Sequence, residues 1–357
     1  MMTTPWLSVI VPAHQGAVQL PQVLDALCAS DLPRERWELI VVDDGSTDST
    51  ADIAAARADR VISLPGPPRG PAHARNRGVE AARGEWVVFI DADVVVHRGT
   101  LSGFAARIQA DPTADAIFGA YDAAPPAPGF LSQYRNLLHR YVHLSSAGDA
   151  ETFWTGCGAM RRSTVLSAGS FDEKRYPRPQ IEDIELGYRV RDRGARIVLD
   201  PAIQGAHLKR WTFWGGVRTD LFDRGIPWVR LLLERGKLAR RANLNLKAGE
   251  RLKSVAVAAA LMLLLIAPLA GRRFGLLVII GITLLSCVTL SNLPQLVWFA
   301  RERSPWFALA TVPMSIWYYL MSGTSVAIGL GLHVLDGRPQ LGRTKSGNAT
   351  NDEENTR

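Results

Sequence analysis

Two pairs of carboxylates stand where apolar runs of the chain end. Asp43 and Asp44 follow one such run, and Asp91 and Asp93 follow another, Trp86–Ile90. Both runs are typical of buried parallel strands, whose carboxyl ends open onto a ligand crevice in α/β sheets. Carboxylates this close repel one another unless a cation or a hydrogen-bonding ligand shares the site. The motifs therefore predict Mg²⁺ or Mn²⁺ carrying a diphosphate, the chemistry of a sugar-nucleotide enzyme.

Further residues near these motifs have types that suit a nucleotide. Arg75 lies in an expected helix that begins at Pro71, and both a guanidinium and a helix N-terminus suit phosphate oxygens. A salt bridge from Arg75 to Asp91 is the alternative and is compatible with this role. Pro12 and Ala13 end the first expected strand, where a small turn without a proline N–H lets a flat base approach the backbone.

Strands and helices alternate along the part of the chain that carries these residues. The pattern predicts strands at Leu7–Val11, Glu38–Asp43, Arg60–Leu64, Trp86–Asp91, Thr152–Ala159 and Arg196–Leu199. It predicts helices at Gln19–Ser30, Asp48–Ala58, Pro71–Ala82, Phe130–Leu144 and Ile181–Arg193. This alternation indicates an α/β fold with a doubly wound, mostly parallel sheet.

The formal net charge of +7 has a local origin in the 357-residue chain. Basic residues cluster directly ahead of an apolar region, at Arg235, Lys237, Arg240, Arg241, Lys247, Arg251 and Lys253. Cations flanking a membrane segment mark its cytoplasmic side and attract anionic lipids. No aromatic-interleaved basic stripe or zinc-finger spacing accompanies them, so we expect a membrane partner and no nucleic acid.

The C-terminal part contains the candidate membrane segments. Val255–Ala270 and Phe274–Leu290 are each near the lower limit for crossing a bilayer, which needs about 20 apolar residues. Trp306–Leu335 is a third candidate, which we expect to be broken by Pro313 and by Ser322–Gly323. Two or three crossings are therefore predicted.

Two features concern the compartment. Cys28, Cys157 and Cys287 are too few and too scattered for a disulfide framework or a zinc site, which indicates packed thiols in a reducing compartment. The N-terminus enters a strand without the cationic and apolar regions of a cleavable signal peptide. We therefore expect the catalytic part in the cytosol.

Five motifs, taken in order, resemble those of the family 2 glycosyltransferases. They are Ser8–Ala13, Val42–Ser46, Ala74–Gly78, Asp91–Asp93 and Glu182–Asp183. The resemblance covers about Ser8 to Trp211 and implies an inverting enzyme with the GT-A fold. The apolar C-terminal part resembles that of membrane-anchored bacterial members.

The resemblance also implies roles for the first motifs. Residues that match Pro12, Ala13, Asp43 and Asp44 hold the nucleoside in the family. Carboxylates such as Asp43 and Asp44 can accept hydrogen bonds from a uracil N–H and from ribose hydroxyls, whereas helix capping fits their neighbours Ser46 and Asp48 better. By the same resemblance Asp93 ligates the metal, and Asp91 contacts the ribose or reaches the metal through water.

Glu182 and Asp183 open an expected helix that also carries Glu185. The matching aspartate of the family is the general base, so the resemblance makes Asp183 the group that deprotonates an acceptor hydroxyl for in-line attack with inversion. Compensation of the helix dipole is the alternative; it explains Glu182 but not three acids in one turn. We expect Glu182 on the acceptor side, together with the small-residue loop Thr155–Met160 that lines the acceptor cleft in the family.

The last motif is His207-Leu208-Lys209-Arg210-Trp211. Processive relatives carry Gln-x-x-Arg-Trp near this place, so the histidine argues against processive synthesis. His207 is expected to complete the metal shell or orient the diphosphate, with a structural role as the alternative. Lys209 and Arg210 suit the departing nucleoside diphosphate. Trp211 is expected to stack on the acceptor or to anchor the domain at the interface.

Together these predictions divide the chain into a cytosolic GT-A domain (1–210), amphipathic interfacial helices (211–253), a transmembrane region (254–336) and a disordered polar tail (337–357). The expected protein is a multi-pass enzyme of the cytoplasmic membrane that makes envelope glycans or glycolipids. It moves a hexose from a nucleotide-diphospho-sugar, expected to be UDP-linked, to a hydroxyl of a lipid or lipid-linked acceptor. Two alternatives stay open: transfer to polyprenyl phosphate, which needs no base, and a membrane scaffold or nucleotide sensor with an inactive site.

Overall fold

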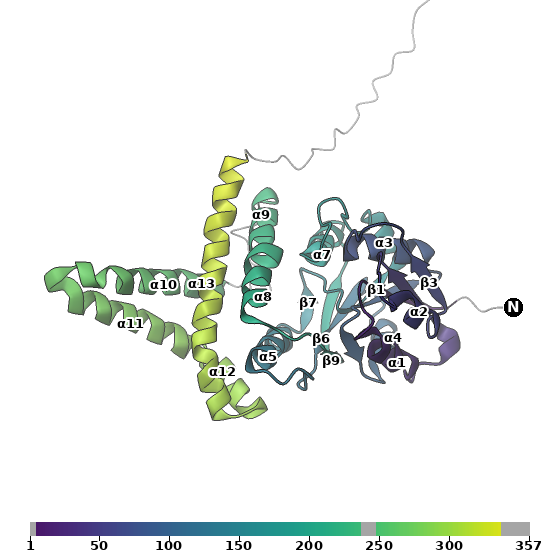
Figure 1. Ribbon diagram of the computed structural model, residues 1–357, viewed down its shortest axis with the longest axis horizontal. Helices are drawn as coiled ribbons and strands as arrows, with labels where there is room; N and C mark the ends of the chain where they lie inside the picture. The colour runs from purple at the N-terminus through teal and green to yellow at the C-terminus, as the bar shows by residue number, and fades with distance from the viewer. Residues whose placement is uncertain (1–4, 237–247, 337–357) are drawn as a thin grey trace, which may run out of the picture.

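The computed structural model describes residues 5–236 and 248–336. An α/β domain forms one side of the molecule, and a helical hairpin projects from the other side (Figure 1). Between them stand two long helical segments. One consists of α8 (Phe213–Arg218), η2 (Thr219–Gly225) and α9 (Ile226–Glu234), and the other is α13 (Pro305–Leu335). Residues 237–247, which belong to the predicted interfacial region 211–253, and the predicted tail 337–357 lie outside the described residues.

A single mixed sheet forms the centre of the α/β domain, with the strand order β3-β2-β1-β4-β8-β6-β9-β5 and β7 paired to β9. The strands are β1 Leu7–Ala13, β2 Trp37–Asp43, β3 Arg60–Ser63, β4 Trp86–Ile90, β5 Val94–Val96, β6 Ala116–Tyr121, β7 Gly148–Ala150, β8 Cys157–Arg161 and β9 Ile197–His207. The parallel arrangement expected from the sequence holds for β3, β2, β1 and β4. Beyond β4 the sheet is mixed, because β8 runs antiparallel to both of its neighbours.

Helices on both faces bury the sheet, which is why β2 and β4 are buried along their whole length. These helices are α1 Leu20–Cys28, α2 Thr50–Ala55, α3 Pro71–Ala81, α4 Thr100–Ala110, α5 Phe130–Leu144, α6 Arg162–Ser167 and α7 Glu182–Asp192. A short 3₁₀ turn, η1 (Arg34–Arg36), precedes β2. The parallel strands β1, β2 and β4 therefore end at one edge of a rigid, buried layer.

Some predicted elements differ in their limits. The strand expected at Thr152–Ala159 begins only at Cys157, and β9 continues past the expected Leu199 to His207. The extension matters because it carries His207 back beside β5, where Val94 pairs with it.

The rest of the described chain is helical. It comprises α8 Phe213–Arg218, a π-helical segment η2 Thr219–Gly225, α9, α10 Ala248–Ile266, the short 3₁₀ turns η4 Ala267–Leu269 and η5 Gly271–Arg273, α11 Phe274–Ser291, α12 Leu293–Glu302 and α13. Three stretches are long and apolar enough to cross a membrane: Gly249–Leu269, Gly271–Ser291 and Pro305–Leu335. The break expected in the third stretch was wrong, since α13 continues through Pro313 and Gly323. Packing explains this, because α13 contacts α9, α10 and α12 along its length.

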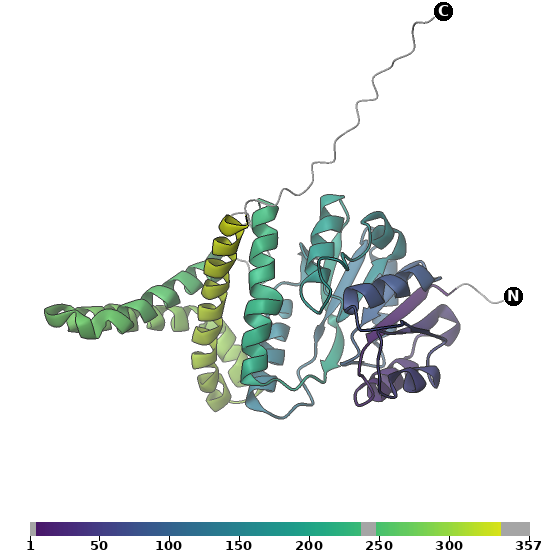
Figure 2. The same cartoon turned by 45° about the horizontal axis from the view of Figure 1, so that its top comes forward.

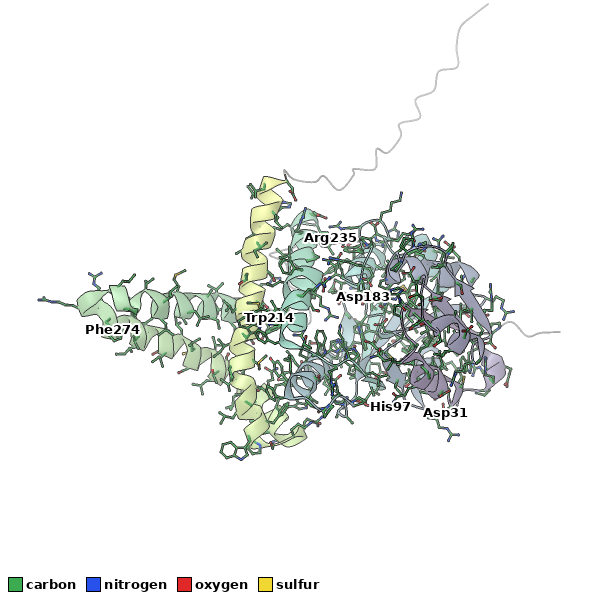
Figure 3. The ribbon with its side chains drawn as sticks, viewed as in Figure 1. Asp31, His97, Asp183, Trp214, Arg235 and Phe274 are labelled. Carbon is green, nitrogen blue, oxygen red and sulfur yellow. The ribbon has the colours of Figure 1, made fainter. Side chains whose placement is uncertain are left out.

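The hairpin of α10 and α11 points away from the α/β domain, and α13 runs across its base (Figures 1 and 2). Phe274 marks the far end of the hairpin, whereas Asp183 lies within the α/β domain facing α9 (Figure 3). On that side Leu231 and Leu232 of α9 pack against Ile181 and Tyr188 of the α/β domain. The helix α9 therefore joins the α/β domain to α13.

Candidate active site

One cavity of about 1480 Å³ lies beyond the carboxyl ends of β1, β2 and β4 and continues to α10 and α13. Asp44, Asp93 and Asp183 all line it. The convergence of the acidic motifs on one crevice, expected from the sequence, is therefore observed, and the individual roles of the acids remain predictions. Pro12 and Ala13 line the same cavity at the end of β1.

The two aspartates after β2 have different surroundings. Asp44 lines the cavity, and its Oδ2 accepts hydrogen bonds from the backbone N–H groups of Arg69 (2.9 Å) and Gly70 (2.7 Å). Gly70 needs to be glycine, since its φ is +91° and a Cβ would lie 2.6 Å from the carbonyl oxygen of Pro177. Asp43 is absent from the cavity lining, and its Oδ1 accepts a hydrogen bond from Ser46 N–H at 3.1 Å. Asp44 thus shapes the rim of the cavity, and Asp43 holds the turn beneath it.

Arg75 joins two of the acidic motifs. Its Nη2 donates to Asp91 Oδ1 at 2.7 Å, and its Nη1 donates to Glu182 Oε1 at 2.8 Å. Arg75 and Glu182 are both buried, so each charge depends on the other for compensation. Burial raises the pKa of Asp91; Arg75 opposes this shift and Asp93 adds to it. The salt bridge considered as an alternative role for Arg75 is therefore present.

Asp93 and His207 form the pair that could bind a metal. His207 Nε2 lies 3.3 Å from Asp93 Oδ2, and the imidazole ring stacks on Tyr121 at 4.4 Å between centroids. Burial raises the pKa of Asp93, but His207 and Lys209 outweigh it and hold the pKa below its ordinary value. Within residues 5–236 and 248–336, no three His, Cys, Asp or Glu side chains form a metal-binding group. An oxygen and an imidazole nitrogen fit Mn²⁺ or Mg²⁺ provided that diphosphate oxygens and water complete the shell.

Asp183 is a carboxyl group of the site with a raised pKa. Its Oδ2 accepts from the backbone N–H of Thr155 at 3.2 Å and from Thr155 Oγ1 at 3.4 Å. Burial and the charge of Glu182 raise the pKa of Asp183 to about 6, although Arg75 and Arg224 oppose the shift. A carboxylate with this pKa, held at a cavity wall, has the properties of a general base near neutral pH.

The last motif divides between the cavity and the surface. Lys209 and Trp211 line the cavity, with Lys209 Nζ 4.2 Å and Arg135 Cζ 4.0 Å from the centre of the Trp211 rings. Burial lowers the pKa of Lys209, Asp93 opposes this shift, and Arg224 and Arg135 reinforce it. Arg210 is exposed and is not part of the cavity lining, so its expected contact with the diphosphate has no support from its position.

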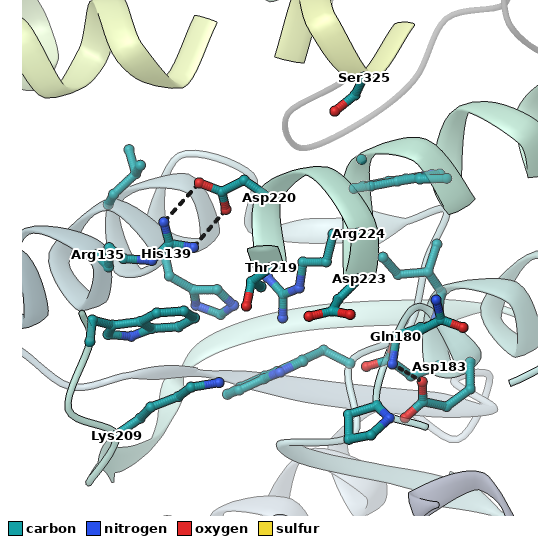
Figure 4. Close-up of a pocket in the computed structure, with 18 of the residues that line it drawn as sticks. Arg135, His139, Gln180, Asp183, Lys209, Thr219, Asp220, Asp223, Arg224 and Ser325 are labelled. Atoms are coloured by element: carbon teal, nitrogen blue, oxygen red, sulfur yellow. Dashed lines mark hydrogen bonds and ion pairs between the residues drawn. The ribbon is translucent and has the colours of Figure 1, made fainter. Parts of the chain in front are cut away.

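The end of the cavity next to α10 and α13 contains polar residues that the sequence patterns did not single out. Arg135 donates two hydrogen bonds to Asp220, at 2.8 and 2.7 Å, and Asp223 and Arg224 line the cavity beside this pair (Figure 4). A signal existed, because Asp220, Asp223 and Arg224 interrupt a stretch otherwise rich in aromatic and aliphatic residues. Tyr121 was missed because it ends a buried apolar strand and looks like ordinary core.

Residues 8–169 match the family model described as glycosyl transferase family 2. The probable glycosyltransferase YdaM of Bacillus subtilis is 27% identical over 258 residues, which cover 68% of this chain and 60% of YdaM. A PGL/p-HBAD biosynthesis glycosyltransferase of Mycobacterium bovis is 36% identical over 123 residues, covering 33% of this chain and 47% of that relative. The chain therefore spans less than two thirds of the length of these relatives.

Solved structures share the fold at low sequence identity. The mannosyltransferase PcManGT of Pyrobaculum calidifontis, in complex with GDP-Man and Mn²⁺, matches with a TM-score of 0.56 and 20% identity over 91% of this chain and 88% of that one. A Staphylococcus aureus TarS fragment in complex with UDP-GlcNAc matches with a TM-score of 0.50 and 18% identity over 92% of each chain. Sequence match and fold agree: residues 8–169 match the family 2 glycosyltransferase model, and the domain that contains them has the GT-A fold.

Proposed function

We propose that the protein is a metal-dependent, inverting glycosyltransferase that moves a hexose from a nucleotide-diphospho-sugar to a hydroxyl of a lipid or lipid-linked acceptor. The observation that carries this proposal is the shape of the cavity. It extends without interruption from the acids at the strand ends to Met262 of α10 and to Trp317 and Val326 of α13. A donor bound at the strand ends would therefore meet an acceptor that enters from the apolar helices.

The donor end has the groups that a nucleotide sugar requires. Pro12 and Asp44 border the space for the nucleoside, and Lys209 supplies a cation beside Asp93. The titles of the structural neighbours name UDP-GlcNAc for TarS and GDP-Man with Mn²⁺ for PcManGT, which supports a nucleotide-diphospho-sugar and a divalent metal here. We retain UDP as the expected nucleotide.

The reaction follows from the positions of the acids. Asp183, with a pKa raised to about 6, takes the proton of the acceptor hydroxyl while that oxygen attacks the anomeric carbon from the side opposite the diphosphate, which inverts the configuration. Lys209 neutralises negative charge on the leaving nucleoside diphosphate. Asp93 and His207 would hold the metal, which when bound adds positive charge at the diphosphate.

A polar cluster at the base of the hairpin bears on membrane placement. Lys253 donates to Glu250 Oε1 at 2.8 Å and to Asn292 Oδ1 at 2.7 Å, and Tyr319 donates to Glu250 Oε2 at 2.8 Å. Tyr319 lies near the middle of α13, so a spanning α13 would put these charges at the bilayer centre, which is costly. We propose instead that α13 lies along the membrane surface.

The hairpin is then the part that crosses the membrane. The 19 residues of α10 extend roughly 28 Å at about 1.5 Å per residue, close to the ~30 Å of a hydrocarbon core. The charged arginines Arg272 and Arg273 at the hairpin tip would emerge on the far side. Two crossings of the cytoplasmic membrane leave the catalytic domain on the cytosolic face, where nucleotide sugars are made.

Calorimetric titration of the full chain in detergent tests the donor part of the proposal. We expect UDP to bind in the presence of Mn²⁺ and to bind at least several-fold more weakly when the metal is chelated. The matched control is Asp93→Asn, which should remove the effect of Mn²⁺ because one ligand is lost. Equal UDP affinity with and without Mn²⁺ would contradict metal dependence, and no UDP binding under either condition would favour the scaffold alternative.

A further inference from the structure

An unpaired cation lies on the membrane side of the cavity. Arg224 belongs to η2, and its side chain extends from that helix into the cavity (Figure 4). Across residues 5–236 and 248–336 no hydrogen bond or ion pair reaches its guanidinium. A guanidinium in a protein stays charged, and one facing a cavity without a partner is suited to an anionic ligand.

The nearby carboxylates are already engaged. Asp220 accepts both of its short hydrogen bonds from Arg135, and Asp223 Oδ1 lies 3.4 Å from Arg178 Nη2. Asp183 is held by Thr155 and by the backbone N–H of Ile184. An incoming anion would therefore compete with no existing ion pair of Arg224.

The backbone that carries Arg224 is held in place on two sides. The Arg135–Asp220 pair joins η2 to α5. On the other side the adjacent Gly225 packs against α13 so closely that a Cβ would lie 2.1 Å from Ser325 Oγ. The segment η2 is also π-helical, a conformation that is often found at functional sites. Arg224 is thus presented from a fixed support rather than from a free loop.

The charge of Arg224 influences pKa values on both sides of the cavity. Burial raises the pKa of Asp183, and Arg224 is among the groups that oppose this shift. Burial and His143 lower the pKa of His139 on α5, and Arg224 adds to that shift. Arg224 therefore lies within electrostatic range of the expected base while belonging to a helix that packs on α13.

We propose that Arg224 binds a phosphate group of the acceptor lipid, on the membrane side of Asp183, so that the enzyme prefers an acceptor whose polar head carries a phosphate. A planar guanidinium binds phosphate oxygens through two parallel hydrogen bonds. The inference rests on the proposed glycosyltransferase function. The donor diphosphate is the other source of phosphate oxygens, and Arg224 lies within electrostatic range of Lys209 at that end of the cavity. Arg224 comes from η2 against α13, however, whereas Asp93 and His207 lie at the ends of strands, so we assign the acceptor phosphate to Arg224 and use UDP affinity to distinguish the two sources.

Binding of a simple probe to the full chain in phosphatidylcholine nanodiscs tests this assignment. The probe is dodecyl phosphate, compared with dodecanol, and the readout is the fluorescence of Trp211, Trp228 and Trp317, which line the cavity. Arg224→Gln should weaken dodecyl phosphate binding by about ten- to hundredfold, as expected for loss of a charge-assisted contact, and leave dodecanol unaffected. Arg224→Lys should lose less, because the charge remains.

The matched control is Arg218→Gln, which changes an exposed arginine of the same helical stretch outside the cavity lining. It should bind dodecyl phosphate as the unmodified protein does. UDP affinity in Mn²⁺ should be unchanged in Arg224→Gln. Unaltered dodecyl phosphate binding by Arg224→Gln would overturn the proposal, and so would a loss of UDP affinity equal to or larger than the loss for dodecyl phosphate. Failure of the unmodified protein to bind UDP would instead refute the glycosyltransferase function, and the dodecyl phosphate comparison would still decide the role of Arg224.

Discussion

The two ends of the cavity are built in different ways. At the donor end, Arg75 of α3 pairs with Asp91, which follows β4, and with Glu182 of α7, so that these charges neutralise one another. At the membrane end, charged side chains come from helices, and Arg224 has no partner among the residues that the structure describes. The donor end therefore contains an ion-pair network that is formed before a ligand arrives, whereas the exposed guanidinium of Arg224 has no such pair among the described residues.

This difference indicates which end of the cavity can change its side chains to bind a different ligand. Strand ends fixed by a buried ion-pair network position catalytic groups accurately and tolerate little change. Helices such as η2 and α13 can change their cavity-facing side chains without disturbing that network. We therefore expect the chemistry to depend on the donor end and the choice of acceptor to depend on the membrane end.

The largest expected effect follows from replacing the base. Asp183→Asn keeps the size of the side chain but removes its ability to accept a proton, so turnover should fall by about 10²- to 10⁴-fold. UDP affinity, measured by calorimetry, should remain within a factor of about two, because the nucleotide is bound by other residues. Full turnover in this variant would favour the rival reaction, in which an already anionic polyprenyl phosphate attacks without a base.

The ion-pair network should dominate stability at the donor end. Arg75→Met leaves the buried Glu182 and the partly exposed Asp91 without their cation and should lower the free energy of unfolding by about 3–5 kcal/mol. Arg34→Gln is the control, because Arg34 and Asp59 form an exposed pair that should contribute less than about 1 kcal/mol. Chemical denaturation of both variants measures the difference. Equal losses would mean that the donor end is not preorganised by this network.

The pH dependence of turnover tests whether Arg224 at one end of the cavity influences the expected base, Asp183. Since the base must be ionised and the pKa of Asp183 is about 6, turnover should rise with pH up to that value and fall about tenfold per pH unit below it. The charge of Arg224 opposes the raised pKa, so Arg224→Gln should move the midpoint of the profile to higher pH, whereas Arg218→Gln should not. A midpoint that stays the same in both variants would show that Arg224 does not influence the ionisation of Asp183.

The donor end could be predicted from the sequence because its residues follow local patterns. Apolar runs that end in carboxylates predict strands and their acidic ends, and those ends do meet in one cavity. The sequence does not predict which of the two carboxylates after β2 lines the cavity and which one stabilises the turn. Asp43 and Asp44 are neighbours of the same type, and only the turn geometry assigns one to Ser46 and the other to the rim near Gly70.

The membrane end could not be predicted because it depends on contacts between distant segments. Arg135 and Asp220 pair across 85 residues of chain, and hydropathy does not reveal such a pair. The continuous α13 has the same cause, since Pro313 and Gly323 carry a local helix-breaking signal that packing overrides. Periodicity identifies an apolar helix but not the neighbours against which it lies.

The smallest effect concerns the contact that supports Arg224. In an exposed helix, replacing glycine by alanine stabilises by roughly 0.5–1 kcal/mol. At Gly225 a Cβ would lie 2.1 Å from Ser325 Oγ and 2.4 Å from the carbonyl oxygen of Asp220, so Gly225→Ala should instead destabilise by about 1–3 kcal/mol. Adding Ser325→Gly should recover only part of this loss, because the Asp220 oxygen is backbone and cannot be removed. Dodecyl phosphate binding should weaken in Gly225→Ala while UDP affinity stays constant, since the displaced segment belongs to the membrane end alone. A stabilised Gly225→Ala protein would show that η2 is not held against α13, and the fixed support for Arg224 would be lost with it.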